Sequence, residues 1–177
     1  MKKNIYILLI GLLVLTGFSS STTANGVRDT KSMFKAIFIS EFATLIDWPS
    51  DYRKGFFTIE VYDNDNALFN MLTKKYAGKA VGSQEILVKK YNPKQKIKSH
   101  IIYVSDSYTT YIPKIVTSIK NKSTLLISDS PNGLKRGSTI NFVINNNRQQ
   151  FEISKSNAKK HKLIIASKLT SLAVRVK

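Results

Sequence analysis

The sequence contains no cysteine, and this absence removes several kinds of protein from consideration at once. Such a chain carries no disulfide, no thiolate metal ligand, no cysteine nucleophile and no lipid-modified cysteine. Histidine is nearly as scarce, and neither residue stands in a spacing typical of metal ligands. His100 opens an apolar stretch and is expected to be a hydrogen-bonded residue of the core or its rim, while the lysines around His161 oppose metal binding. We therefore predict no metal site and no cofactor.

Acidic residues are also few, at 11 against 28 Lys and Arg, and the net charge is +17. No pair of acids reads as a general acid and base, and no nucleophile elbow or phosphate-binding loop occurs. We predict that the chain is not an enzyme and has no catalytic residues. Of the basic residues, 23 are lysine. Contacts to bases and phosphates favour arginine, so nucleic acid is not an expected partner. The lysines either cover a solvated surface or attract an anionic membrane or acidic partner.

A long apolar run is missing too, since the one near the N-terminus covers residues 5–15 and is short for a membrane-spanning helix. It follows Lys2 and Lys3 and precedes small polar residues, with Ala24 available for cleavage. This arrangement is typical of a secretory signal peptide. We predict a cleaved signal peptide at 1–24 and one domain at 25–177, with an uncleaved N-terminal anchor as the alternative.

An aromatic-rich segment at 30–49 predicts the helix around which the rest of the chain is organised. At about 100° per residue, its apolar side chains fall on one broad arc, the pattern of a helix buried along much of its circumference. Thr30 is the expected N-cap, and Pro49 ends the helix because its ring disfavours the helical conformation at Trp48. The residues predicted to be structural are Phe34, Phe42, Trp48 and Pro49.

Beyond this helix the hydrophobic pattern alternates between strands and helices. Residues 56–62 alternate apolar with polar, as in a strand, whereas 100–104 and 124–128 are short apolar runs typical of strands buried on both faces. Asn145–Asn147 separate two alternating runs and predict a hairpin, because Asn tolerates the positive φ of a tight turn. The expected strands are 56–62, 85–90, 100–104, 124–128, 139–145 and 148–154, and the expected helices are 67–76, 108–120 and 163–176.

This order predicts the α/β class: a single three-layer domain with a mixed, roughly six-stranded sheet and helices on its faces. Asp129 and Gly133 follow a buried strand, the place where α/β folds put ligand groups, and are the candidates for a ligand cleft. Asp129 is alternatively a turn cap. Arg148 and Glu152 on the hairpin are candidates for binding a partner, and a salt bridge is the alternative role of Glu152.

Four stretches, taken in order, resemble the YfiR-like family of exported regulators. The first helix with its Trp48-Pro49 ending and the run His-Ile-Ile-Tyr-Val-Ser at 100–105 are similar to the opening helix and a strand of that family. The others are Leu-Leu-Ile-Ser-Asp at 125–129 with its continuation, and Phe-Glu-Ile-Ser at 151–154 with the segment 165–173. Ser99 stands where many members have cysteine, so the family's disulfide and its redox sensitivity do not carry over.

The resemblance implies a periplasmic, non-enzymatic regulator that binds an inner-membrane signalling protein. The founding type binds the periplasmic part of a diguanylate cyclase and holds it inactive, lowering cyclic-di-GMP signalling, and other members stand near sensor kinases. Homodimerisation is left open. Two rival functions also stay open: a periplasmic small-ligand-binding protein with a cleft near Asp129, and a membrane-surface module that uses the lysine-rich loop 89–98.

Overall fold

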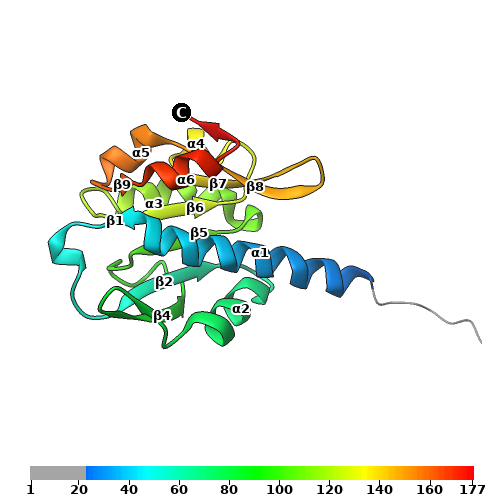
Figure 1. Ribbon diagram of the computed structural model, residues 1–177, viewed down its shortest axis with the longest axis horizontal. Coiled ribbons are helices and arrows are strands. Elements are labelled where there is room, and N and C mark those ends of the chain that lie inside the picture. Colours follow the sequence, from blue (N-terminus) through cyan, green and yellow to red (C-terminus); the bar gives the residue numbers. More distant parts are fainter. Residues whose placement is uncertain (1–22) are drawn as a thin grey trace, which may run out of the picture.

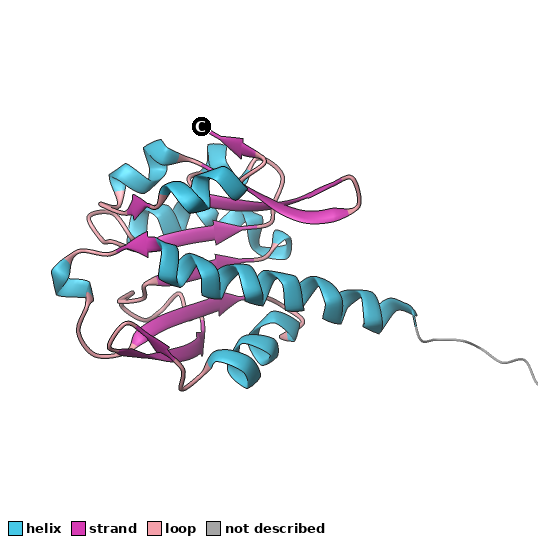
Figure 2. Cartoon of the chain, viewed as in Figure 1, coloured by secondary structure: helices cyan, strands magenta, loops and turns pink. Residues whose placement is uncertain are grey.

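The computed structural model describes residues 23–177, so positions 1–22 of the predicted signal peptide lie outside the described residues. The chain forms an α/β domain in which a mixed sheet separates two helical layers (Figures 1 and 2). The helices are α1 (Thr23–Leu45), α2 (Ala67–Tyr76), α3 (Ile112–Ser118), α4 (Gly133–Arg136), α5 (Lys155–Lys160) and α6 (Ser167–Leu172), with short 3-10 turns η1 (Ser50–Tyr52) and η2 (Asp106–Tyr111).

The main sheet has eight strands in the order β10-β8-β7-β6-β5-β2-β4-β3. The predicted count of six was wrong because two short edge strands, β3 and β10, extend the sheet at its ends. The strands are β2 (Phe57–Tyr62), β3 (Ala80–Val81), β4 (Gln84–Lys90), β5 (Ile101–Val104), β6 (Leu125–Ser128), β7 (Ile140–Asn145), β8 (Arg148–Ile153) and β10 (Arg175–Val176). The central strands β4, β2, β5, β6 and β7 are mutually parallel, so their carboxyl ends lie at one edge.

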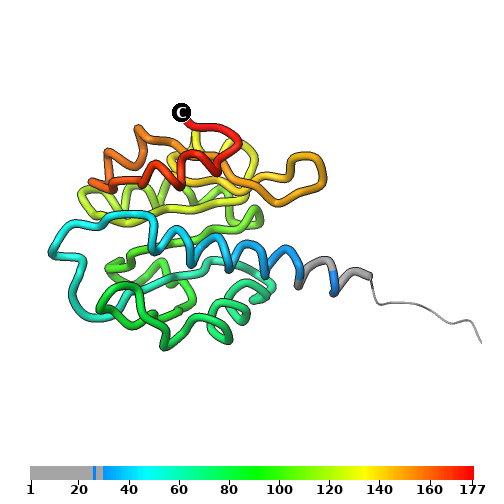
Figure 3. Tube along the Cα trace, viewed as in Figure 1, coloured from blue at the N-terminus to red at the C-terminus, as the bar shows by residue number. Residues whose placement is uncertain are grey.

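The β7–β8 hairpin forms as predicted, with Asn145 paired to Arg148 and positive φ at Asn146 and Asn147. By contrast, the predicted C-terminal helix 163–176 was wrong. That segment divides into the strand β9 (Ile164–Ile165), the helix α6 and the strand β10. β9 pairs with β1 (Ile46–Asp47) in a separate two-stranded sheet, which brings the end of α1 beside the C-terminal segment (Figure 3).

The long helix α1 differs from its prediction at both ends. It begins upstream of Thr30, whose hydroxyl donates to the Gly26 carbonyl inside the helix instead of capping it. It ends at Leu45, before Pro49, because Ile46 and Asp47 pair with β9. Pro49 begins the turn η1 instead.

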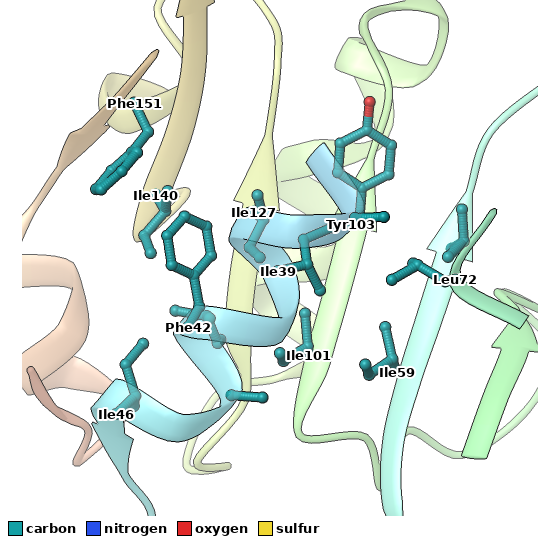
Figure 4. Close-up of a cluster of buried hydrophobic side chains, with 14 of the residues drawn as sticks. Ile39, Phe42, Ile46, Ile59, Leu72, Ile101, Tyr103, Ile127, Ile140 and Phe151 are labelled. Atoms are coloured by element: carbon teal, nitrogen blue, oxygen red, sulfur yellow. The ribbon is translucent and has the colours of Figure 1, made fainter. Parts of the chain in front are cut away.

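The buried face of α1 is also rotated from the predicted arc. Phe42 is fully buried, whereas Phe34, assigned to the same arc, is 45% exposed. Phe34 is therefore not the core residue that the periodicity predicted. α1 crosses the sheet at one side, and its inward face packs on β5, β6, β7 and β8 (Figure 4). The residues of α1 in this core are Ala36, Ile39, Phe42 and Ala43.

A smaller core fills the opposite face of the sheet. There α3 packs its isoleucines against the outward side chains of β5 and β6, including Ile102 and Leu126. β5 and β6 are thus buried on both faces, which explains why each reads as an unbroken apolar run.

His100 lies at the entrance to β5 and connects the turn η1 to the sheet. Its Nδ1 accepts a hydrogen bond from the Thr58 amide at 3.1 Å, and its Nε2 lies 2.6 Å from the Tyr52 carbonyl. Both contacts are satisfied by the neutral ring, with the proton on Nε2. Burial lowers the pKa of His100 below its ordinary value of 6.5, and the hydrogen bond to Tyr52 opposes this shift.

This geometry predicts an acid-sensitive fold. The unfolded histidine binds a proton at a higher pH than the folded one, so the stability that His100 contributes above pH 6.5 is lost as the pH falls below it. Urea unfolding at a series of pH values on both sides of 6.5 measures this slope. His100→Gln should flatten the slope in that window, and an unchanged slope in this variant would assign the acid sensitivity to other groups.

Candidate functional site

A polar cleft of about 540 Å³ opens between the N-terminal half of α1 and the β7–β8 hairpin. Both elements extend past the same end of the sheet (Figure 1). The cleft lies where β5 and β6 end, so its lining includes Asp129 at the base and the exposed Asp106 at the rim. Lysines of α1, Lys135 of α4 and the C-terminal strand complete the walls. Its volume is in the range of small-molecule sites, about 300–1,000 Å³, although its lining is more polar than most.

Three side chains from separate elements form a hydrogen-bonded network at the base of this cleft. Lys35 donates to the Tyr103 hydroxyl at 2.9 Å, and this hydroxyl donates to Oδ2 of Asp129 at 2.7 Å. The Lys35 ammonium also pairs directly with Oδ2. Burial raises the pKa of the Tyr103 hydroxyl well above its ordinary value, and the charge of Asp129 raises it further. Tyr103 therefore remains a protonated donor, and the network holds the Asp129 carboxylate in one orientation.

The network leaves hydrogen-bonding capacity unused. Oδ1 of Asp129 and Oγ of Ser130 are buried without a hydrogen-bond partner among residues 23–177. Both residues line the cleft. Buried carboxylate oxygens in proteins are nearly always satisfied, so such an atom calls for an explanation. A donor group on a bound molecule or a water at Asp129 would satisfy it.

Gly133, the other candidate for the ligand cleft, lies next to the cleft in the chain. It is buried at the start of α4, against a hydrogen bond of 2.7 Å from the Ser128 hydroxyl to Oδ1 of Asn141. A Cβ at this position would lie 2.2 Å from Oγ of Ser128 and 2.3 Å from Oδ1 of Asn141. Gly133 is absent from the cleft wall, where Asn132 and Leu134 stand instead. Its role is to let α4 approach the end of β6.

Gly133→Ala should therefore destabilise the fold by about 1–3 kcal/mol, the usual cost of forcing an extra methyl into a packed site. The buried Ser128–Asn141 pair has no room to retreat. Chemical denaturation measures the effect. Gly26→Ala is the matched control, since nothing lies within 4 Å of a Cβ there, and it should not destabilise the fold. Equal effects at the two glycines would contradict the packing argument.

The hairpin residues predicted to bind a partner lie on two sides of this site. Glu152 lines the cleft and pairs with Arg175 of β10 at 2.6 Å. Arg148 is exposed near the tip of the hairpin and is not part of the cleft wall. The structure thus brings Asp129 and Glu152 into one cleft and places Arg148 outside it.

Sequence reasoning missed the two other members of the network, Lys35 and Tyr103. Tyr103 stands inside an apolar strand and looks like core. Lys35 was detectable in principle, because it shares one face of α1 with Ile39 and Phe42, and a charge on a buried face indicates a partner. The partner itself was not detectable, because Asp129 is far away in the sequence.

Sheet, helical layers and cleft together define a three-layer α/β domain with a polar cleft at the carboxyl ends of its central strands. The model of the YfiR/HmsC-like family matches residues 32–174, and the chain belongs to this family. The family is regulatory rather than catalytic, which fits a regulatory role for this chain. No curated protein matched the sequence.

The fold also resembles a solved structure, a conserved domain protein from Vibrio cholerae O1 biovar El Tor strain N16961, with a TM-score of 0.56 and 12% sequence identity. The match covers 82% of this chain and 60% of the other. At 12% identity the likeness concerns the fold alone. Within residues 23–177, no helix combines the length and hydrophobicity needed to cross a membrane.

Proposed function

We propose that this chain is a periplasmic regulator that binds and modulates an inner-membrane signalling protein, such as a diguanylate cyclase or a sensor kinase. In this proposal residues 1–24 are a cleaved signal peptide and 25–177 are the working domain. The observation that carries it is the family match over 32–174. A regulator of this kind needs to bind one state of its partner better than another, and a tenfold shift takes about 1.4 kcal/mol of differential affinity.

The proposed contact surface is the end of the molecule from which α1 and the hairpin project. Ile144 near the hairpin tip is 54% exposed, and Phe34 on α1 is 45% exposed. Arg148 lies across the hairpin from Asn145, close to Ile144. Exposed apolar side chains beside an arginine are typical of protein contact sites. Glu152 lies farther along the same hairpin strand and pairs with Arg175, and in this proposal it helps to orient the contact surface.

The test is recovery of a signalling protein from detergent-solubilised membranes of the source cells, with the purified protein as bait. We expect the wild-type protein to retain a membrane cyclase or kinase, identified by mass spectrometry, and Ile144→Asp with Arg148→Glu to lose it. Light scattering of the same bait decides between monomer and homodimer.

The control is Lys74→Glu on α2, an exposed charge on an element that lies away from the hairpin. It should retain the partner. Absence of any signalling protein with bait of normal melting temperature would count against the proposal. Equal loss with Lys74→Glu would show that net charge, instead of the hairpin, governs capture.

A small-ligand-binding protein is the second candidate, and the unused Oδ1 of Asp129 favours it. A fitting ligand would offer a hydrogen-bond donor to this oxygen. It would also carry a negative charge toward the cationic wall, which includes Lys31, Lys35 and Lys135. Small polar molecules with both features are the class to screen.

Thermal shift measurements on wild-type protein and Asp129→Asn test this candidate. A ligand of the cleft should raise the melting temperature of the wild type and lose most of this effect in the variant. Asp106→Asn, at the exposed rim, is the matched control and should keep the larger part of it. Equal shifts in wild type and Asp129→Asn would place binding elsewhere.

A further inference from the structure

We propose that a second surface, at the end of the molecule opposite the hairpin, docks on an anionic lipid bilayer. It is formed by α5 and β9, which lie at the far end from the hairpin tip (Figure 1). Its members are Lys155, Lys159, Lys162 and Ile164, which line one shallow hollow of about 480 Å³, and they are called the basic face below. This inference goes beyond the proposed function, because it concerns lipid and needs no protein partner.

Charge of one sign dominates this part of the chain. From Ile153 to Lys177 there are seven lysine or arginine residues and no aspartate or glutamate. The three lysines of the basic face are exposed, and within the described part of the chain none of them forms an ion pair. Asp47 on β1, which lies opposite Ile164, is the nearby acid, and Arg53 pairs with it at 3.3 Å. The basic face thus carries three lysines that no ion pair among residues 23–177 neutralises.

An exposed apolar side chain borders the same hollow as these lysines. Ile164 is 69% exposed, the largest value among the large hydrophobic side chains that the structure describes. It borders two hollows, the one on the basic face and a smaller one of about 230 Å³ toward the end of α1. An exposed aliphatic side chain that borders one hollow with three lysines matches the two requirements of interfacial binding, namely apolar insertion and attraction to anionic headgroups.

The backbone at Lys162 gives a further reason to assign a role to this face. Lys162 has a φ of 53°, in the left-handed region where a helix commonly ends on glycine. The Leu163 amide bonds to the Ala158 carbonyl at 3.1 Å, which completes that helix ending. A lysine is held here against its backbone preference, and such positions are typical of functional surfaces.

The composition of the basic face favours lipid over an acidic protein. Protein interfaces are enriched in arginine and aromatic residues and depleted in lysine. The basic face contains lysine and an aliphatic residue but no arginine and no aromatic side chain. Lysine presents a compact charge on a flexible stem, which suits mobile headgroups that offer no fixed geometry.

The test is co-sedimentation of the purified protein with vesicles of phosphatidylethanolamine and phosphatidylglycerol, compared with vesicles of phosphatidylcholine alone. We expect binding to the anionic vesicles, weak or no binding to the neutral ones, and a decline as salt is added. Each lysine near an anionic surface contributes about fivefold in affinity, so Lys155→Glu with Lys159→Glu should weaken binding by about 25-fold or more.

Two matched controls separate the basic face from overall charge and hydrophobicity. Lys94→Glu with Lys96→Glu makes the same charge change in the exposed loop after β4 and should retain most of the binding. Ile164→Ser should weaken binding to anionic vesicles, whereas Ile144→Ser, at the opposite end, should not.

Lys162→Gly is the most informative variant, because it should weaken vesicle binding without lowering the melting temperature. Glycine accepts the left-handed backbone without strain, so the melting temperature should rise or stay level. Loss of one lysine should weaken vesicle binding about fivefold. A general loss of folding would lower both quantities together.

Several results would overturn the inference. They are equal binding to neutral vesicles, binding that persists at high salt, and a loss in the Lys94 and Lys96 variant as large as that in the Lys155 and Lys159 variant. No binding to anionic vesicles at low salt would also overturn it and would point to an acidic protein surface instead. Capture of a signalling protein by the hairpin is unaffected by any of these outcomes.

Discussion

Replacing Phe42 by alanine should lower the free energy of unfolding by about 3–5 kcal/mol, the usual cost of emptying a buried aromatic site. Phe42 is fully buried where α1 crosses the sheet. Its ring stacks on Phe142 at 5.9 Å and meets Phe151 edge-on at 5.0 Å, which joins the helix to both strands of the hairpin. The surrounding rings belong to regular elements and cannot collapse into the space. Urea denaturation of the wild type and the variant measures this loss.

The same helix supplies a matched control for this prediction. Phe34→Ala removes the same atoms from a side chain that is 45% exposed, so it should cost far less than Phe42→Ala. The two variants also distinguish the buried face of α1 that the periodicity predicted, which includes Phe34, from the face that is buried in the structure. Equal losses at the two positions would favour the arc and contradict the structure.

Trp48→Ala should have an effect of similar size, about 3–5 kcal/mol, for a related reason. Trp48 is 6% exposed and packs edge-on against Phe57 at 5.1 Å, with His100 at 5.9 Å. It joins the segment after α1 to the entrance of β2 and β5. In a domain of this size each kcal/mol shifts the melting temperature by about 2–4 °C, so a fall of about 6–20 °C is expected. Calorimetry measures it.

A second substitution at Trp48 tests whether packing or the indole N–H matters. The Nε1 atom of Trp48 is buried and finds no hydrogen-bond partner in the described chain. Trp48→Phe keeps an aromatic ring and removes this unsatisfied donor, so it should cost clearly less than Trp48→Ala. Phe56→Ala, at a neighbouring side chain that is 54% exposed, should have a small effect. A melting temperature unchanged by Trp48→Ala would show that the indole is not structural.

The sequence predicted where the candidate site lies, but it did not predict which side chains contact Asp129 there. Asp129 was identifiable because a buried apolar strand ends beside it, and strand ends in α/β sheets gather polar groups. Its partners, Lys35 and Tyr103, come from α1 and β5, and only the folded chain brings the three together. Gly133 was identified by position alone, and its tight contact with Asn141 depends on where β7 lies.

The sequence alone determined those features that depend on neighbouring residues. The alternation of β2, the apolar runs of β5 and β6 and the asparagine turn of the hairpin are local signals, and each of these elements formed where predicted, as did α2. The α/β class and the family resemblance follow from the order of these elements.

Tertiary structure alone decided the rest. The pairs β1–β9 and β8–β10 join segments far apart in the chain, and strands of two residues carry no period by which to recognise them. The same is true of the face that α1 turns inward: helical periodicity places Phe34 and Phe42 on one arc, but the position of the sheet decides which of them is buried. Local periodicity leaves open which face of a helix is buried and which short segments pair, and long-range contacts decide both.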